Sequence, residues 1–525
     1  MNKPSLTINH RITWPALLIL VIYCIPMVVW QEESLGVLNA IFAVIVDYGG
    51  NFYVWFSILM TLASLYFICT KYGSVVLGAP DSKPRFGWGA YLSIIVAMGI
   101  GSTIMRTGVI TWAPIAQAPP LGLEPLTESA LAFGNAYGMY LWSFQTFAIF
   151  SMGAPAIGYL LYVRRTPVLR MSEIYRCIFG NRFVDGAGGI VVDILFLVAI
   201  VAGAATFLGL GTPIVTAIVA KILGVESSFA LTFCVTLVWI VLFTASVMLG
   251  LEKGIKVLSS VNMYVAAMLG VFIIIAGPTT FIFGFFFDTL ASLASNFHAF
   301  VINTPEPPGV EGAFDVQRYT IFWWAYGATW SLLHSIFAAK ISEGRTIRQL
   351  LLSYLLAPLA LAWIATAILG GLGAGVFSDG SVPVMEILND KGQMAAIAEI
   401  VGSVTGGLLT LVVFSILTMT FFATTLDSTT FSVSAYTDTN DMHKQDPSGS
   451  IRLMWSLIIS VIALVLMKVG GLAPLEVTSG LLGLPIVFIQ LSAVYAAKKM
   501  MDEDEAWKYN VRGAPTRVTS SGSAE

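Results

Sequence analysis

The sequence predicts an all-α integral membrane protein with twelve transmembrane helices, on the evidence of its composition, its apolar runs and its basic residues. Of its 525 residues 57% are hydrophobic and 11% are charged, whereas soluble proteins carry about 25% charged residues. Twelve runs reach the roughly 20 apolar residues that a helix needs to cross the hydrocarbon core. These expected spans lie at residues 13–31, 51–79, 87–114, 135–163, 187–221, 229–250, 256–286, 317–340, 348–377, 399–436, 451–468 and 473–497.

The basic residues are distributed unevenly between the loops. With the N-terminus in the cytoplasm, 22 of the 27 lysines and arginines fall on the cytoplasmic side and four on the opposite side, and Arg106 lies inside the third span. Cytoplasmic loops are enriched in Lys and Arg, and one missed span would invert every later loop. We therefore expect an even number of spans in the cell inner (plasma) membrane, with both termini cytoplasmic.

The rest of the chain shows no pattern typical of an enzyme or a cofactor site. Its four cysteines form no short-spaced pair and its four histidines do not cluster, so neither disulfides nor a metal-binding spacing is indicated. A membrane sensor with the same spans would normally carry a signalling domain, and no soluble domain is expected. The tail from residue 501 onward is polar, and we expect it to be disordered. We predict no enzymatic activity, no cofactor and no nucleic-acid partner.

The third span contains the features that best indicate a binding site. Gly99, Gly101 and Gly108 weaken a helix at membrane depth, and broken helix is tolerated there only where it lines a cavity or is buried in protein. Close helix packing through small residues is the alternative. Arg106 favours the interpretation that the segment lines a cavity. Placing a guanidinium near the middle of the membrane costs free energy unless it has a polar partner. That partner is either a ligand or a fixed group elsewhere in the protein.

The tenth span is rich in hydroxyl groups, in the segment TMTFFATTLDSTTFSVSAYTDT. Most Ser and Thr side chains in membrane helices bond the carbonyl of the preceding turn. Hydroxyl oxygens are also ligands for a small, hard cation such as sodium. Asp427, in the middle of the segment, is either a cation ligand or a structural hydrogen-bonding residue.

Four separated segments resemble the betaine/choline/carnitine transporter family (BCCT). They are the glycines of the third span, LVAIVAGAATFLGLGTPIV at 197–215, GLEKGIKVLSSVNM at 250–263 and RYTIFWWAYGATWSLLHSIFAAKISEGRTIRQL at 318–350. The last looks like the family's eighth-span signature, a Trp-rich helix followed by a basic turn. The resemblance covers about residues 13–498.

The resemblance implies a LeuT-like fold of two five-helix inverted repeats preceded by two extra helices. It also implies a homotrimer embedded in membrane lipid, with an outer interfacial helix at the contact between protomers. The expected parts are a cytoplasmic N-terminus at 1–12, two accessory transmembrane helices at 13–79, a first inverted repeat at 87–286, the interfacial helix at 288–301, a second inverted repeat at 317–497 and a cytoplasmic tail at 498–525.

Members of the family hold a quaternary ammonium group in a box of aromatic rings, since such a cation is attracted to ring faces. The resemblance places this box on Tyr137, Trp142 and Gln145 of the fourth span and Tyr326 and Trp330 of the eighth. The broken segment around Met98, Gly99 and Gly101 is implied to contact the substrate as well.

This chain departs from the family's box at three positions. Gly327 has no ring, Gln145 has an amide, and Arg106 adds a positive charge. A permanent cation such as choline is disfavoured beside an uncompensated guanidinium, whereas a carboxylate or sulfonate can bond it in a bidentate contact. We therefore expect a small zwitterionic or anionic-headed solute such as a betaine or taurine. The alternatives are a choline- or carnitine-type transporter or exchanger, or a transporter-like sensor.

The resemblance also implies a sodium ion that couples transport. Its ligands are carbonyls of the third span and hydroxyls of the tenth, here Ile95, Met98, Phe421, Thr424 and Thr425, and the family spacing F-x-x-T-T is intact. The family's sodium-independent antiporters carry an arginine in the seventh span, where this chain has a methionine, and this favours symport. The resemblance leaves open whether one or two sodium ions are transported per cycle. Proton coupling through His334 is the remaining alternative.

Overall fold

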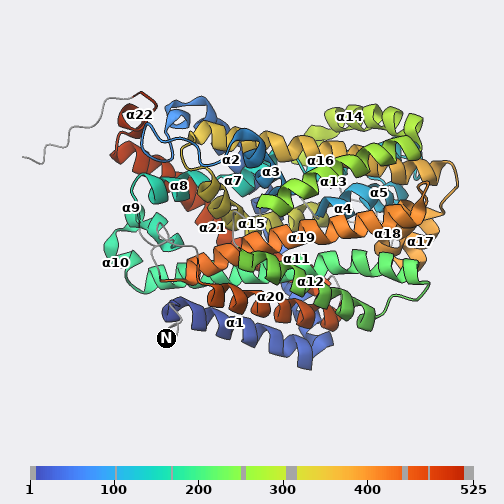
Figure 1. The fold of residues 1–525 in the computed structure, drawn as a ribbon, viewed down its shortest axis with the longest axis horizontal. Coiled ribbons are helices and arrows are strands. Elements are labelled where there is room, and N and C mark those ends of the chain that lie inside the picture. Colours follow the sequence, from blue (N-terminus) through green and yellow to red (C-terminus); the bar gives the residue numbers. More distant parts are fainter. Residues whose placement is uncertain are drawn as a thin grey trace, which may run out of the picture.

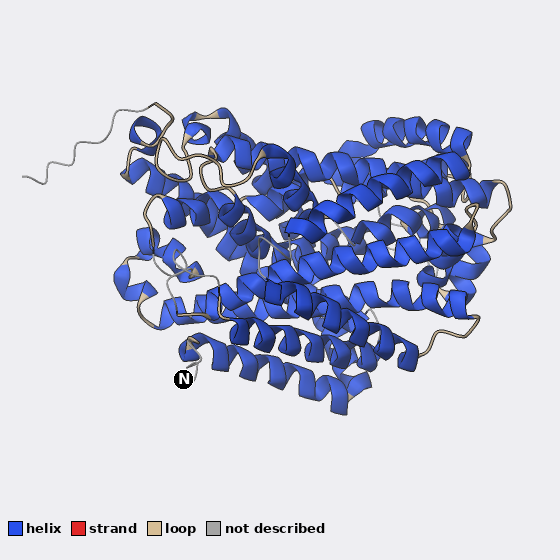
Figure 2. Ribbon diagram, viewed as in Figure 1, coloured by secondary structure: helices blue, strands red, loops and turns tan. Residues whose placement is uncertain are grey.

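The computed structural model describes residues 8–100, 103–166, 170–249, 256–302, 316–439, 447–470 and 473–513. Within these residues the secondary structure is helical, and Figure 2 shows helices joined by loops. The longer helices are α1 (His10–Val29), α2 (Gln31–Cys69), α11 (Ala187–Leu223), α12 (Phe229–Leu249), α13 (Lys256–Ala276), α14 (Thr279–Val301), α15 (Val316–Ile341), α16 (Ile347–Ser378), α19 (Gly407–Thr437), α20 (Gly449–Gly470) and α21 (Ala473–Glu503). The shorter ones are α3 (Trp88–Gly99), α4 (Thr103–Ile110), α5 (Trp112–Gln117), α6 (Glu128–Leu141), α7 (Phe144–Ser151), α8 (Ala154–Tyr162), α9 (Arg176–Phe179), α10 (Asn181–Val184), α17 (Val384–Lys391), α18 (Gln393–Gly402) and α22 (Ala506–Tyr509).

The helices confirm a multi-pass membrane architecture, but not the count of twelve spans. Among the described residues nine helices are long and apolar enough to cross a membrane, or ten if the bent pair formed by α3 and α4–α5 is one span. The apolar parts of α13 and α20 are shorter, and α15 is not among the nine. The many Trp, Tyr and His residues of α15 lower its mean hydropathy. The inverted repeats and the domain boundaries stay predictions.

Two expected spans are interrupted helices. The third span bends by 67° between α3 and α4, where the glycine-containing segment had predicted a break. The fourth span consists of α6, α7 and α8, and neither of its breaks was predicted. A break exposes backbone carbonyls at one helix end and N–H groups at the next, so both spans bring polar backbone groups to membrane depth.

Several predicted boundaries differ from the structure. Residues 32–50, expected to connect the first two spans, belong to the first half of α2. The expected span at 256–286 ends at Ala276, where Gly277 and Pro278 interrupt it, and α14 then runs from Thr279 to Val301 in place of a helix at 288–301. Two short helices, α17 and α18, precede α19.

The expected disorder of the tail is wrong for residues 501–513, while 514–525 lie outside the described residues. Trp507 of α22 lies under the Lys71 ammonium, 3.1 Å from the ring centroid. Asp504 accepts hydrogen bonds from Arg164 and Tyr159, each at 2.9 Å. The backbone N–H of Val76 donates to the Asn510 carbonyl at 2.9 Å. These contacts with two earlier segments, residues 71–76 and 159–164, order the polar chain.

Figure 1 shows how the two ends of the molecule differ. The start of α1, the short helices α9 and α10, and α22 lie toward one end, and α5, α17 and α18 lie toward the other. Helix α15 runs through the interior, where it packs against α21, α7, α8, α2 and α11. Nearly all its side chains are buried. Because it is enclosed on every side, α15 can present a polar or aromatic face to an internal cavity without exposing it to lipid.

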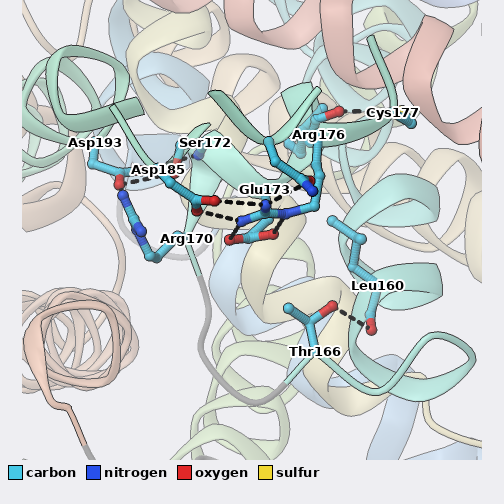
Figure 3. Close-up of polar contacts among 11 residues, drawn as sticks. Leu160, Thr166, Arg170, Ser172, Glu173, Arg176, Cys177, Asp185 and Asp193 are labelled. Carbon is cyan, nitrogen blue, oxygen red and sulfur yellow. Dashed lines mark hydrogen bonds and ion pairs between the residues drawn. The ribbon is translucent and has the colours of Figure 1, made fainter. Parts of the chain in front are cut away.

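A polar cluster at the end with α9 and α10 joins three segments of the chain, and Figure 3 shows two of them, at Arg170 and Ser172 and at Asp193. Its centre is Asp193 of α11, which is fully buried. The carboxylate accepts hydrogen bonds from Arg170 Nε at 2.8 Å, Tyr436 Oη at 2.6 Å, and the Ser172 N–H and Oγ, both at 2.9 Å. The cluster therefore links the loop before α9 to the ends of α11 and α19.

Candidate functional site: an aromatic cavity at two broken helices

An internal cavity lies where the two interrupted spans meet α11, α15 and α19. Its lining consists of Met98, Ile100, Thr103, Trp142, Thr146, Phe150, Phe207, Trp323, Tyr326, Gly327, Trp330, His334 and Thr425. In this conformation it measures about 30 Å³, room for about two or three water molecules. A solute of several heavy atoms therefore requires the surrounding rings to move apart.

The break in the fourth span positions Trp142. Residues Trp142 and Ser143 separate α6 from α7, and the carbonyl of Leu141 accepts hydrogen bonds from Trp323 Nε1 at 2.7 Å and from Thr146 Oγ1 at 2.5 Å. The Trp142 indole N–H donates to Thr107 Oγ1 of α4 at 3.0 Å. The break is thus held by contacts with both α15 and α4, and it fixes an indole ring at the cavity wall.

One face of α15 supplies a continuous row of rings. Trp323, Tyr326, Trp330 and His334 recur at three- and four-residue spacing, which places them on one side of a helix. The centroids of Trp323 and Tyr326 lie 6.3 Å apart, and those of Tyr326 and Trp330 lie 6.1 Å apart. Trp142 meets Trp323 edge to face at 5.1 Å. Such faces attract a cationic head group.

Arg106 lies one turn beyond Thr103 on α4. Its side chain is buried, with 5% of the residue exposed. Among the described residues its guanidinium donates from Nη2 to the hydroxyl of Tyr319, at 3.4 Å. Tyr319 stacks on Trp323 of the cavity at 6.3 Å. No carboxylate within the described ranges forms an ion pair with Arg106, so the alternative of a fixed acidic partner receives no support there.

Two predicted residues of the aromatic box do not line the cavity. Tyr137 is buried against α14 and α15, where its hydroxyl contacts Thr320 Oγ1 at 2.6 Å. Gln145 donates to Ser57 of α2 at 3.1 Å. The break after Leu141 changes the helical phase of α7, so that Thr146 lies at the cavity wall and Gln145 faces α2. Met98, Trp142, Tyr326 and Trp330 line one cavity, whereas Arg106 is not among its lining residues. Gly99 ends α3, and Gly101 lies outside the described residues.

The predicted sodium residues divide between the cavity and its surroundings. Met98 and Thr425 line the cavity, whereas Phe421 borders a separate apolar cavity of about 340 Å³. Ile95 is fully buried on α3. The Thr424 hydroxyl donates to the Thr420 carbonyl at 2.9 Å and accepts from Asn262 at 3.2 Å. Helices α3 and α19 pack together, which brings the two halves of the predicted site into one region.

Several lining residues were missed by the sequence argument. Thr103 and Thr146 add hydroxyl groups, and Phe150, Phe207 and Trp323 add rings. Thr103 is three residues before Arg106, and helical spacing would have found it. Asp427 is fully buried on α19 and faces Ser246 of α12, and it does not line this cavity. In the described part of the chain no group of three or more His, Cys, Asp or Glu could hold a metal ion.

An internal cavity at the meeting point of two broken membrane spans is typical of small-molecule transporters. Residues 11–506 match BCCT, the betaine/carnitine/choline family transporter. The chain belongs to this family. It is a secondary transporter and not an enzyme, and the resemblance found in the sequence is confirmed.

Two solved structures are also similar to the chain. One is described as a substrate-bound outward-open state of a Na⁺-coupled sialic acid symporter; identity is 12%, 86% of each chain is covered, and the TM-score is 0.49. The other is a crystal structure of MhsT in complex with L-phenylalanine; identity is 12%, 81% of this chain and 100% of that chain are covered, and the TM-score is 0.47. Similarity at this level does not bear on the substrate of this chain.

Proposed function

We propose that the protein is a sodium-coupled symporter that takes up a small zwitterionic or anionic-headed solute, such as a betaine or taurine. The observation that carries the proposal is Arg106, a buried guanidinium without a carboxylate partner among the described residues, whose hydrogen-bond partner Tyr319 stacks on Trp323 of the aromatic cavity. We further propose that the termini are cytoplasmic and that the protein assembles as a homotrimer.

The position of Arg106 favours a ligand with an anionic group. An arginine at membrane depth costs at least about 2.5 kcal/mol, and such residues mark substrate pathways by default. The guanidinium has five N–H donors, and Tyr319 occupies only one direction around it. A carboxylate or sulfonate would accept two parallel N–H···O hydrogen bonds from the guanidinium in a charge-assisted, bidentate contact.

The aromatic rings of α15 can bind the cationic group of a zwitterion. From Trp323 to His334 the lining face of α15 extends over about 16 Å, at 1.5 Å per residue. An anionic group held by Arg106, near Tyr319, leaves the cationic group of a short zwitterion beside Trp323 and Tyr326, where cation–π attraction operates. One solute can therefore contact both features when the rings separate.

Sodium coupling is supported by the arrangement of α3 and α19. The last turn of α3 ends in carbonyl groups that have no partner within the helix, and these carry the partial negative charge of a helix C-terminus. Thr425 lines the same cavity as Met98, and its hydroxyl donates to the Phe421 carbonyl at 3.3 Å. Because carbonyl and hydroxyl oxygens suit a hard cation, an ion bound there would hold the bent span in position for the solute. At 100 mV its charge adds about 2.3 kcal/mol to uptake.

Replacement of both Thr424 and Thr425 by alanine is expected to abolish the sodium dependence of uptake. The double variant removes two hydroxyl oxygens from the proposed site, while both residues remain in a well-formed helix. Uptake of labelled solute into liposomes, measured over a range of sodium concentrations, tests this. Thr418→Ala is the matched control, since Thr418 is buried on the same helix and bonds its own backbone at Phe414. A double variant with the wild-type sodium response would disprove the site.

The second candidate is a choline- or carnitine-type transporter or exchanger, which is favoured by the four rings Trp142, Trp323, Tyr326 and Trp330. The same liposomes separate the two candidates. If choline competes with labelled taurine or betaine as well as the unlabelled solute does, the guanidinium does not discriminate against a bare cation and the first proposal fails.

A further inference from the structure

A second, larger cavity lies at the bend of the third span, lined by residues of α4, α13, α16 and α19 (Figure 1). Its volume is about 340 Å³, and all of its lining residues, which belong to the described part of the chain, are apolar. An engineered apolar cavity of about 150 Å³ stays dry and binds benzene. An unfilled space also deprives the surrounding side chains of dispersion contacts. The lining therefore favours an apolar occupant over water.

The mouth of this apolar cavity opens on the lipid-facing surface of the protein. Val271 of α13 and Ile364 of α16 line the cavity, and they are 57% and 53% exposed. Ile364 lies near the middle of α16, which is long and apolar enough to cross a membrane, so the mouth is at the depth of the hydrocarbon core. The cavity is thus continuous with the surface that acyl chains cover, and lipid headgroups lie outside that region.

The length of the cavity wall matches one acyl chain. The lining residues of α13 run from Met263 to Ile274 and extend over about 16 Å of helix, at 1.5 Å per residue. The hydrocarbon core is about 30 Å thick, so each of its two leaflets contributes about 15 Å. An extended hydrocarbon chain can therefore contact the whole wall, whereas a compact apolar molecule contacts only part of it.

The inner end of the apolar cavity borders the aromatic cavity. Ile100, the residue that follows α3 at the bend, is buried and lines both cavities. On α19, Phe421 lines the apolar cavity, and Thr425, one turn later, lines the aromatic one. An occupant of the apolar cavity therefore packs against the wall that separates the two.

We propose that the apolar cavity binds one acyl chain of a bilayer phospholipid, which enters between α13 and α16 and packs against the bend of the third span. The chain fills the space on the other side of Ile100 from the aromatic cavity and completes the packing around the interrupted helix. A break in a membrane helix is tolerated where it is buried or lines a cavity. The site depends on the apolar lining and the lipid-facing mouth, and not on the solute or the coupling ion.

Photolabelling with a lipid tests the proposal directly. The full-length protein is placed in phosphatidylcholine vesicles that contain a small fraction of a phosphatidylcholine with a diazirine near the end of one acyl chain. After irradiation without solute, mass spectrometry locates the labelled residues. We expect label on Met105 of α4 and Phe421 of α19, which are buried in the cavity wall, and on Met268 of α13, which is 64% exposed. Any surrounding lipid reaches Met268, whereas the buried pair requires a chain inside the cavity.

Variants that fill the cavity are expected to exclude the chain. Ala266 and Gly270 both line the cavity, one turn apart on α13. A Cβ atom at Gly270 would lie 3.5 Å from Ile368 Cδ1, an ordinary contact, so a larger side chain fits there. In the double variant Ala266→Leu/Gly270→Leu the label on the buried residues is expected to fall at least about fivefold, because a close-packed interior leaves no room for a chain. Label on the exposed methionine is expected to stay unchanged.

Ile275→Phe is the matched control, because it adds volume to the same helix outside the cavity, at a residue that is 73% exposed. It is expected to leave the whole labelling pattern unchanged. Thermal unfolding in detergent shows which variants fold. Each single leucine variant is expected to give a partial decrease, and these variants keep the test decisive if the double variant does not fold.

Three results would overturn the inference. Label confined to Met268 in the wild type would mean that no chain enters the cavity. Label on neither Met268 nor the buried residues would mean that a second copy of the chain or another protein covers the mouth. Unchanged label on Met105 and Phe421 in the folded leucine variants would mean that the chain reaches them by another route. Because no solute is present, none of these results depends on the proposed function.

Discussion

Replacement of Arg106 by alanine is expected to raise the Kd for an anionic-headed solute by about 30- to 1000-fold, corresponding to the roughly 2–4 kcal/mol lost when one partner of a buried charge pair is truncated. The solute's anionic group would be left desolvated beside Tyr319, its counter-charge removed. Binding to the purified protein, measured with sodium present, gives the value directly.

The same substitution has a second expected effect, of opposite sign. In the absence of solute the guanidinium is buried without an acidic partner among the described residues, and removal of an uncompensated buried charge stabilises a protein. Arg106→Ala is therefore expected to unfold at a higher temperature than the wild type when no solute is present, and to gain less from added solute. A structural arginine would give the reverse result.

Two further variants serve as controls for Arg106. Arg106→Lys keeps the charge but not the planar fork, and is expected to bind with intermediate affinity because one ammonium cannot form the bidentate contact. Arg318→Ala removes an exposed arginine near the start of α15 and is expected to leave binding unchanged. If Arg106→Ala binds like the wild type, the solute does not contact the guanidinium.

The transmembrane architecture was predictable because a chain that crosses lipid needs long apolar helices. Such helices appear in the sequence as long runs of apolar residues. The bend in the third span was predictable for a similar reason, since Gly99, Gly101 and Gly108 lower helix stability in the sequence itself. The end of α13 was also marked, by Gly277 and Pro278, and was missed because the apolar run continues across it. Pro278 removes a backbone donor, and this interrupts a helix regardless of hydropathy.

The break in the fourth span could not be predicted from local sequence. Neither Trp142 nor Ser143 is a helix-breaking residue, and the break is held by tertiary contacts, from Trp323 to the Leu141 carbonyl and from Trp142 to Thr107. Because the helix is interrupted after Leu141, the side chains of α7 do not continue the helical spacing of α6. The spacing of an α7 residue from Trp142 therefore does not predict which neighbouring helix its side chain faces. The family resemblance placed Gln145 in the aromatic box, whereas in the structure Thr146 lines the cavity.

The second large effect is expected for Asp193→Ala, at the polar cluster of Figure 3. The substitution leaves the Arg170 guanidinium, the Tyr436 hydroxyl and the Ser172 N–H without their acceptor in a site where Asp193 is fully buried. Breaking a buried pair by removal of one partner costs about 3–5 kcal/mol. We expect a lower temperature of unfolding and a shorter half-life on heating, measured in detergent without ligand.

Asp185 provides the matched control, because it forms an ion pair at the same end of the molecule with very different exposure. Its carboxylate lies 2.9 Å from Arg176, and its side chain is 60% exposed; the hydrogen bond from Arg176 lowers the pKa of Asp185. Exposed pairs contribute little because water solvates both charges, so Asp185→Ala is expected to unfold close to the wild-type temperature. An equal decrease of the unfolding temperature in Asp193→Ala and Asp185→Ala would mean that burial of the carboxylate does not determine its contribution to stability. Since α11 and α19 both reach the cavity, at Phe207 and Thr425, a loss confined to Asp193→Ala would show that the two helices depend on this contact at their ends.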